Sequence, residues 1–222
     1  MGLGDELLLA GQASRLGEPV DLWHKGRRVE NELYQFMPHV SPNGKRFEEA
    51  PHRGYIQDIR RNPKQVIFNL DYRPVPSPIV LDPIENDYVI IEPTIKLGAP
   101  PAKLWHHYQQ VVDAIDAKFL QFCNKTLDGT DIKTTTLTEA ARLMAGCRLY
   151  VGAEGFLHHL AAALGKPAVV IIGAYSPVEV IGYDFHTNIA VNDPEELGHS
   201  TKTGAMDRIT PEQVIEACRK LL

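Results

Sequence analysis

The sequence has little cysteine, no excess of basic residues and no long apolar run, and each shortage excludes a class of protein. Its three cysteines, Cys123, Cys147 and Cys218, stand far apart among 222 residues. They form neither a CxxC pair, as in many zinc sites, nor the dense pattern of a disulfide-stapled secreted domain. We therefore expect reduced thiols and a cytoplasmic protein.

The balance of charge is slightly acidic. The chain has 23 Lys and Arg against 28 Asp and Glu, which gives a net charge of −5 at pH 7. A protein that grips nucleic acid through its phosphates usually carries a broad positive field. Nucleic acid is therefore the less favoured partner for this chain.

The N-terminal stretch MGLGDELLLAGQ has no basic region, and its apolar part is far shorter than the roughly 20 residues that a membrane-spanning helix needs. The sequence therefore predicts no signal peptide and no transmembrane segment. The shares of hydrophobic residues (44%) and charged residues (23%) are typical of a folded globular protein.

From residue 88 onward, short apolar runs alternate with helix-like segments. The expected strands are 88–94, 118–123, 148–152, 168–173 and 187–191, and the expected helices are 101–119, 136–147, 157–165 and 210–222. Strands that alternate with helices in this way form right-handed crossovers and a parallel sheet covered on both faces. The fold class that we predict is α/β with a doubly wound, Rossmann-like C-terminal sheet.

The first part of the chain is less regular. We expect a helix over 5–17 and short strands over 20–23 and 65–70, separated by a long polar stretch over 25–63. Four prolines in DYRPVPSPIVLDPIEND exclude a continuous helix or strand there. We interpret this segment as a connection between a reduced N-terminal α/β lobe (1–80) and a C-terminal lobe (81–222).

The stretch VGAEGFLHHLAAALG, residues 151–165, combines a strand end, a glycine turn and a helix start. Gly152 and Gly155 would let the backbone approach a ligand, and the free N–H groups of the helix could hold a diphosphate. Glu154 could accept hydrogen bonds from sugar hydroxyls, with His159 one turn later. The residues alone support a structural alternative equally well, in which the glycines shape a turn, Glu154 caps the helix and the histidines pack.

A longer block resembles a known family. TLTEAARLMAGCRLYVGAEGFLHHLAAALGKPAVVIIGAYSP, residues 136–177, is similar to the donor-binding signature of glycosyltransferase family 9, the ADP-heptose:lipopolysaccharide heptosyltransferases, whose enzymes have the two-lobed GT-B fold. The resemblance implies that a nucleotide-diphospho-sugar binds the C-terminal lobe. The donor-binding candidates in this block are Thr136, Gly152, Glu154, Gly155, His159, Gly173, Tyr175 and Ser176.

The resemblance extends to the start of the chain. GLGDELLLAGQASRL is similar to the family's glycine–aspartate turn, and it puts Asp5 in the position of the base that takes a proton from the acceptor hydroxyl. EPTIKLGAPPAKLWHHY resembles a lysine-bearing family loop, so Lys96 and Lys103 would balance the charge of the donor diphosphate. The residues themselves leave open a helix cap for Asp5 and solvated surface charges for the lysines.

Two features depart from the family pattern. No strand precedes the glycine–aspartate turn in this sequence, so either the start lies upstream or the lobe is built without that strand. The donor turn has Glu154, Gly155 and Phe156 where the family commonly has an aspartate, a hydroxyl residue and glycine.

The leading hypothesis is an inverting, metal-independent glycosyltransferase that moves a sugar from an ADP-heptose-like nucleotide sugar to a carbohydrate or other hydroxyl acceptor, with no cofactor. One alternative is a non-catalytic nucleotide- or sugar-binding protein derived from the donor lobe. Another is a glycosyltransferase that acts on nucleic-acid bases, such as those of a phage genome. The donor nucleotide, the acceptor and the oligomeric state stay open at this point.

Overall fold

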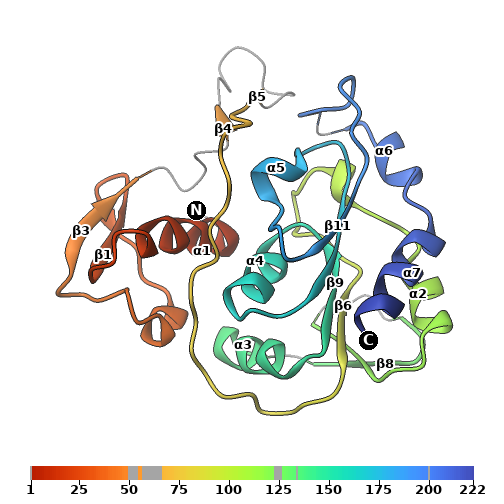
Figure 1. Cartoon of the computed structure of the whole chain (residues 1–222), viewed down its shortest axis with the longest axis horizontal. Coiled ribbons are helices and arrows are strands. Elements are labelled where there is room, and N and C mark those ends of the chain that lie inside the picture. The colour runs from red at the N-terminus through yellow and green to blue at the C-terminus, as the bar shows by residue number, and fades with distance from the viewer. Residues whose placement is uncertain (1, 50–54, 57–66, 123–126, 134, 200) are drawn as a thin grey trace.

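The structure is a computed structural model that describes residues 2–49, 55–56, 67–122, 127–133, 135–199 and 201–222. It has an α/β fold in which a small three-stranded sheet lies to one side of a larger six-stranded sheet (Figure 1). None of the helices in the described part of the chain is long and apolar enough to cross a membrane. Cys147 and Cys218 are buried free thiols, whereas Cys123 lies outside the described residues.

The large sheet is parallel throughout and has the strand order β11–β10–β9–β6–β7–β8. This finding confirms the predicted doubly wound sheet. Its strands are β6 (Val89–Glu92), β7 (Phe119–Gln121), β8 (Thr130–Ile132), β9 (Leu149–Ala153), β10 (Ala168–Ile172) and β11 (Thr187–Ala190).

The chain enters this sheet in its middle, at β6. It builds β7 and β8 on one side, and then returns to add β9, β10 and β11 on the other side. The strand order therefore reverses between β6 and β9. In open α/β sheets, ligands bind beyond the carboxyl ends of the strands at such a switch point. The fold thus indicates where a site should lie before any side chain is considered.

Helices cover both faces of the sheet (Figure 1). Successive residues of a strand point to opposite faces, so Val89 and Ile91 of β6 pack into one hydrophobic core and Ile90 packs into the other. One face carries α2 (Tyr108–Ala114), α6 (Gly204–Asp207) and α7 (Pro211–Leu221), and the other carries α3 (Leu137–Gly146) and α4 (Phe156–Ala163), with α5 (Val178–Ile181) after β10.

The N-terminal part packs directly on the large sheet's helical layer. Helix α1 (Leu3–Ser14) lies against α4, and one hydrophobic core joins α1 and the small sheet to α3 and α4. In the small sheet, β1 pairs with β3 in parallel and with β2 in antiparallel fashion. The remaining elements here are β1 (Val20–His24), β2 (Arg27–Arg28), η1 (Glu32–Phe36), β3 (Lys45–Glu48), β4 (Tyr55–Ile56) and β5 (Ile67–Phe68).

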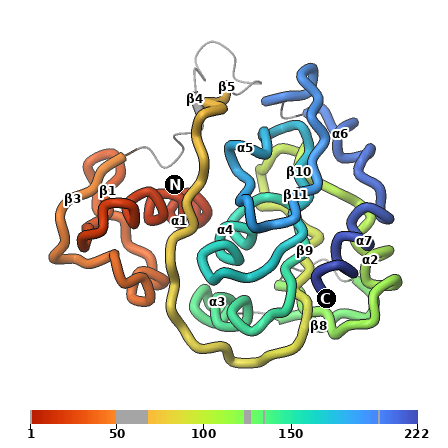
Figure 2. The backbone as a smooth tube through the Cα atoms, in the orientation of Figure 1, coloured from red at the N-terminus to blue at the C-terminus, as the bar shows by residue number. Residues whose placement is uncertain are grey.

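The proline-bearing segment 71–87, called here the connecting segment, runs past α1 and beneath α3 before it enters β6 (Figure 2). Gly11 of α1 allows its close approach, because a Cβ there would lie 1.9 Å from the Val75 carbonyl oxygen. The Ile79 N–H donates to Ala163 O at 3.2 Å, and the Val80 N–H donates to Phe36 O at 2.9 Å. The segment therefore ties α4 to η1, while a lobe boundary near residue 80 stays a prediction.

The helix expected over 101–119 is much shorter in the structure. Residues Pro101–Lys103 form the 3₁₀ helix η2, and α2 covers only Tyr108–Ala114. Between them, Trp105 is buried and its indole Nε1 donates to Ile209 O at 2.8 Å. Helical periodicity could not reveal this break, because the tryptophan binds a carbonyl more than 100 residues away in the chain.

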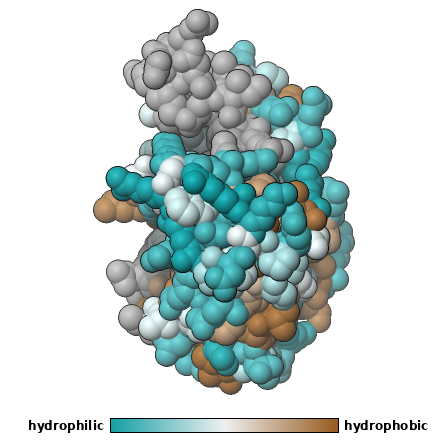
Figure 3. Space-filling model, turned by 90° about the vertical axis from the view of Figure 1, so that its left-hand side faces the viewer, coloured by the Kyte–Doolittle hydropathy of each residue, from teal (hydrophilic) through white to brown (hydrophobic). Residues whose placement is uncertain are grey.

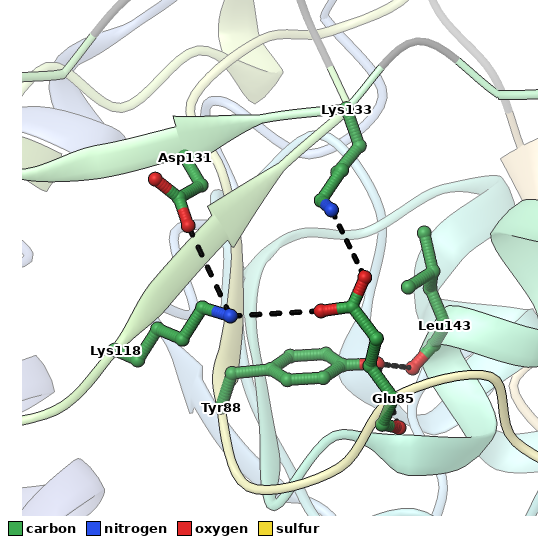
Figure 4. A network of polar contacts seen from close by, with 6 residues as sticks. All are labelled: Glu85, Tyr88, Lys118, Asp131, Lys133 and Leu143. Carbon is green, nitrogen blue, oxygen red and sulfur yellow. Dashed lines mark hydrogen bonds and ion pairs between the residues drawn. The ribbon is translucent and has the colours of Figure 1, made fainter.

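A polar network fixes the start of β6 (Figure 4). The Glu85 carboxylate accepts from Lys133 Nζ at 2.9 Å and forms an ion pair with Lys118 at 3.5 Å. The Tyr88 hydroxyl donates to Leu143 O at 2.6 Å. These contacts join the start of β6 to β7, β8 and α3.

The side of the molecule formed by the small sheet is mostly hydrophilic over its described surface, with hydrophobic residues towards its lower end (Figure 3). This agrees with the small sheet's exposed strands β2 and β3, whose residues are charged or polar at all but one position.

Candidate active site

A pocket of about 870 Å³ opens at the switch point of the large sheet. Its floor is formed by the carboxyl ends of β6 and β9, and its walls include the N-termini of α1 and α4. Ligand pockets commonly have volumes of roughly 300–1,000 Å³. The polar and charged side chains that line it are those of Asp5, Glu6, Glu92, Thr94, Lys96, Lys103, Tyr150, Glu154, His159 and Tyr175.

Two helix N-termini meet at this pocket. A Cβ on Gly4 would lie 3.5 Å from the Phe156 backbone nitrogen and 3.2 Å from His159 Cδ2, so glycine lets the first turn of α1 approach the first turn of α4. The first N–H groups of any α-helix have no acceptor within the helix, and the helix dipole places partial positive charge there. The two helix starts therefore favour a negatively charged group beside them, although the pocket lining also includes four carboxylates.

Lys103 and Glu154 form an ion pair inside the pocket. Their side chains are 17% and 7% exposed, and the ammonium group also lies 4.9 Å from the centre of the Tyr175 ring. Lys103 ends η2, which approaches β10 closely because a Cβ on Gly173 would lie 2.7 Å from Ala102 O. Burial raises the pKa of the Tyr175 hydroxyl, so the ring stays neutral beside the cation.

Each of the other three carboxylates in the pocket is oriented by a hydrogen bond. Asp5 accepts from the Gly2 N–H at 2.8 Å, and Glu6 accepts from Asn31 Nδ2 at 2.6 Å. Glu92, which ends β6, accepts from the Thr94 N–H at 2.9 Å and from its hydroxyl at 2.5 Å. Their directions are thus set by the fold.

Lys96 lies near Asp5, at the start of α1. A Cβ on Gly2 would lie 3.7 Å from Lys96 Nζ and 3.7 Å from Asp5 Oδ2. Loop 93–100 therefore brings a cation to the residue predicted to act as the base, whereas Lys103 reaches the pocket from η2, which follows this loop.

Behind the pocket wall, α4 carries a cluster of histidine and aromatic rings. His159 Nδ1 lies 2.9 Å from the Tyr183 hydroxyl, and the rings of His158 and His186 lie within 5.3 Å of each other. Burial lowers the pKa of His158 well below its usual value and lowers that of His186 to about 4. Both rings are therefore neutral in the folded protein near pH 7.

This burial predicts a loss of stability in acid. The pKa of His186 is near 6.5 in the unfolded chain and about 4 in the fold, so the unfolded state binds more protons between these values. The contribution of neutral His186 to the free energy of unfolding is fully present above about pH 6.5, and it is lost as the pH falls towards 4. We expect His186 to account for a loss of about 3 kcal/mol in unfolding free energy between pH 7 and pH 4.

Urea unfolding of the wild type and His186→Gln at both pH values measures this loss. Glutamine keeps a donor for the Lys166 carbonyl, which His186 Nε2 contacts at 3.1 Å, but it does not titrate. The variant should therefore lose less stability in acid than the wild type. Equal losses in the two proteins would contradict the assignment.

The structure brings together seven of the predicted site residues. They line the pocket, and they are Asp5, Lys96, Lys103, Glu154, Gly155, His159 and Tyr175. Thr136, Gly152, Gly173 and Ser176 lie outside its lining. Thr136 caps α3, where its hydroxyl accepts from the Glu139 N–H and the Glu139 carboxylate accepts from the Thr136 N–H.

Gly152 and Ser176, which also lie outside the lining, are packed in the protein interior. Gly152 lies within β9 rather than in the turn after it, and a Cβ there would lie 2.3 Å from the Tyr150 hydroxyl oxygen. It therefore makes room for the Tyr150 ring, which does line the pocket. Ser176 is buried, and its hydroxyl has no hydrogen-bond partner among the described residues.

Sequence reasoning missed Glu6, Glu92, Thr94 and Tyr150 as pocket residues. Glu92 had a detectable signal, since an acidic residue directly follows the apolar run of a central strand. The Glu6–Asn31 hydrogen bond joins residues 25 positions apart, so no local pattern could show it.

Next to Asn31, a second pocket of about 280 Å³ lies in the N-terminal part, bordered by Asp21, Arg28 and Tyr34.

Within the described ranges, no group of three or more His, Cys, Asp or Glu residues is arranged to hold a metal ion.

Residues 114–209 match the model of glycosyltransferase family 9 (heptosyltransferase). No curated protein matches the chain. Among solved structures, the iron-containing dodecameric glycosyltransferase TibC of enterotoxigenic Escherichia coli superposes with a TM-score of 0.66. That alignment has 15% identity and covers 100% of this chain and 74% of TibC.

Two further structures are similar over part of the chain. TibC in complex with ADP-D-β-D-heptose has a TM-score of 0.51 and 17% identity, covering 67% of this chain and 50% of that one. ADP-heptose lipopolysaccharide heptosyltransferase II of E. coli has a TM-score of 0.49 and 20% identity, covering 62% of this chain. The alignment spans 47% of the length of the latter enzyme. At these identities the TibC superpositions support the fold alone.

Proposed function

We propose that this chain, which carries a glycosyltransferase family 9 domain over residues 114–209, transfers a sugar from a nucleotide-diphospho-sugar to an acceptor hydroxyl with inversion at the anomeric carbon. An ADP-heptose-like compound is the proposed donor. One observation carries the proposal: a pocket at the switch point of the sheet holds Asp5 together with Lys96, Lys103 and two helix N-termini.

The donor diphosphate binds between the first turn of α4 and the lysines. Glycosyl transfer develops negative charge on the departing diphosphate, and preorganised positive groups that face it stabilise the transition state. Lys96, Lys103 and the N–H groups at the α4 start supply that charge in this pocket. Glu154 accepts hydrogen bonds from hydroxyls of the donor sugar. The transfer is therefore proposed to need no metal ion.

Asp5 acts as the general base. Its carboxylate takes the proton of the acceptor hydroxyl while the acceptor oxygen bonds to the anomeric carbon, and the bond from that carbon to the diphosphate oxygen breaks on the opposite side. The diphosphate leaves with the electron pair of the broken bond. A base in this role typically contributes about 10²–10⁴-fold to the rate.

The acceptor approaches from the N-terminal part of the chain. Glu6 lines the main pocket and binds Asn31, which borders the second pocket. This hydrogen bond therefore links the linings of the two pockets next to Asp5 in the chain. A carbohydrate or another hydroxyl-bearing acceptor is the proposed partner, and the cytoplasmic location expected from the sparse cysteines belongs to the same proposal.

A ligand panel tests the function. Thermal shift with ADP, UDP, GDP, CDP and their sugar conjugates, in the presence of EDTA, should single out one nucleotide. A ligand present at 100 times its Kd stabilises the native state by about 2.7 kcal/mol. When acceptor glycans are then added to the matching sugar conjugate, the protein should release that nucleoside diphosphate. Failure of every nucleotide to shift the Tm would contradict the proposal.

A non-catalytic nucleotide- or sugar-binding protein is the second candidate. The buried Lys103–Glu154 ion pair favours it, because the two charges balance each other within the protein. Titration calorimetry combined with a transfer assay separates the two. Donor binding without transfer or hydrolysis, unaltered in Asp5→Asn, would identify the binding protein.

A further inference from the structure

His159 is held on three sides at the wall of the pocket. Its Nδ1 faces the Tyr183 hydroxyl at 2.9 Å, its Cδ2 lies against Gly4, and its ring packs on the His158 ring with centroids 4.9 Å apart. His159 is also among the residues that line the pocket. Because Nδ1 faces the Tyr183 hydroxyl, Nε2 is the ring nitrogen on the side away from Tyr183.

Tyr183 reaches His159 from a different part of the fold. It follows α5, in the loop that leads to β11, and its side chain passes behind α4. The residue is 4% exposed, and its ring also contacts the rings of His158 and His186 edge-on. Burial raises the pKa of the Tyr183 hydroxyl, so the phenol keeps its proton near neutral pH.

The direction of the hydrogen bond follows from this proton. Among the described residues, His159 Nδ1 is the hydrogen-bond partner that the structure gives the Tyr183 hydroxyl. If Nδ1 carried a proton and donated it, the phenol proton would lie buried without an acceptor, which is costly. The favourable arrangement has Tyr183 donating to an unprotonated Nδ1. A neutral imidazole then carries its proton on Nε2.

We infer that Tyr183 is a positioning residue: by donating to Nδ1, it fixes His159 as the neutral tautomer that presents an Nε2–H donor to the pocket. In the proposed transfer, His159 then binds an oxygen of the donor diphosphate or sugar and does not act as a base. This inference rests on the proposed function for the identity of the ligand, but not for the tautomer.

The tautomer can be read from the protein itself. Long-range ¹H–¹⁵N correlation spectra distinguish a protonated ring nitrogen from an unprotonated one, and the signals that disappear in His159→Gln identify His159 among nine histidines. In the wild type, Nε2 should appear protonated and Nδ1 unprotonated. In Tyr183→Phe, both His159 nitrogens should shift towards averaged values. A wild-type ring protonated on Nδ1 would overturn the inference.

Tyr88→Phe is the matched control. It also removes one buried hydroxyl, which donates to Leu143 O at 2.6 Å, but it lies away from the residues that line the pocket. A general effect of losing a buried tyrosine hydroxyl would appear in both variants. Movement of the His159 nitrogen signals in Tyr88→Phe to the same extent as in Tyr183→Phe would contradict the role assigned to Tyr183.

Kinetics test the consequence for the reaction. Tyr183→Phe should lower kcat/KM for the donor about tenfold, the effect of one lost hydrogen bond and its orientation, with the KM for the acceptor unchanged. His159→Gln places an amide donor near the Nε2 position and should retain more activity than His159→Asn, whose amide lies near the Nδ1 position. In the His159→Gln background, Tyr183→Phe should have no further effect.

The outcomes separate this inference from the proposed function. A protein that binds no nucleotide sugar but shows the expected tautomer change would contradict the proposed function alone. A protein that transfers sugar normally in Tyr183→Phe, or in which His159→Asn outperforms His159→Gln, would overturn the role of His159 as a donor while leaving the transferase proposal intact.

Discussion

Asp5→Asn should reduce sugar transfer about 10²–10⁴-fold, the range attributed to a general base. Asparagine has nearly the same shape as aspartate, and its carbonyl oxygen can still accept from the Gly2 N–H that Asp5 binds at 2.8 Å. The start of α1 should therefore stay in place. What the substitution removes is the ability to take a proton from the acceptor hydroxyl.

Two measurements accompany this variant. The Kd for the nucleoside diphosphate, determined by calorimetry, should stay close to that of the wild type, because the proposed role of Asp5 concerns the acceptor and not the nucleotide. Glu6→Gln is the matched control, since it neutralises the neighbouring carboxylate that binds Asn31 and should cost far less activity. If Asp5→Asn transfers sugar at the wild-type rate, another group is the base and the assignment is wrong.

The second large effect concerns the Lys103–Glu154 ion pair. Lys103→Met should weaken nucleoside diphosphate binding by about 10–100-fold, the loss of one charge-assisted contact of roughly 1.5–3 kcal/mol. It should also lower the free energy of unfolding by about 3 kcal/mol, because it leaves the carboxylate of Glu154, whose side chain is 7% exposed, buried without its cation.

The double variant Lys103→Met/Glu154→Gln separates these two effects. Removing both charges should restore most of the stability, since no uncompensated charge remains, but it should not restore nucleotide affinity. Lys45→Met breaks an exposed ion pair with Glu18 and serves as a control that should change stability little. A double variant as unstable as Lys103→Met would show that the loss does not come from an unpaired Glu154.

The large sheet could be predicted because its strands are buried on both faces. Val169, Val170 and Ile171 of β10 are all fully buried, so the strand appears in the sequence as a continuous apolar run. The edge strand β8 has no such run, since its residues are half-buried or exposed, and it was missed. Strands β2 and β3 of the small sheet were missed for the same reason.

The candidate site was predictable where its residues follow a strand or belong to a family motif. Asp5 came from the resemblance, whereas Glu154 was first indicated by the glycine turn after a strand, and the structure places both in one pocket. The pairing of Glu154 with Lys103 joins residues 51 positions apart, and the contact between His159 and Tyr183 spans 24 positions. Such contacts depend on how the elements pack, which no local sequence pattern records.

The packing of α1 against α4 makes the C-terminal part of the chain depend on the N-terminal part. Leu7, Leu9 and Ala10 share one core with Leu160 and Ala161, while the first turn of α1 supplies Asp5 to the pocket. A fragment cut at the connecting segment would expose that apolar surface to water and lose the part of the pocket wall that residues 2–8 supply. The part of the chain after the connecting segment is therefore unsuited to being moved by itself into another protein, and truncated copies should aggregate rather than bind a ligand.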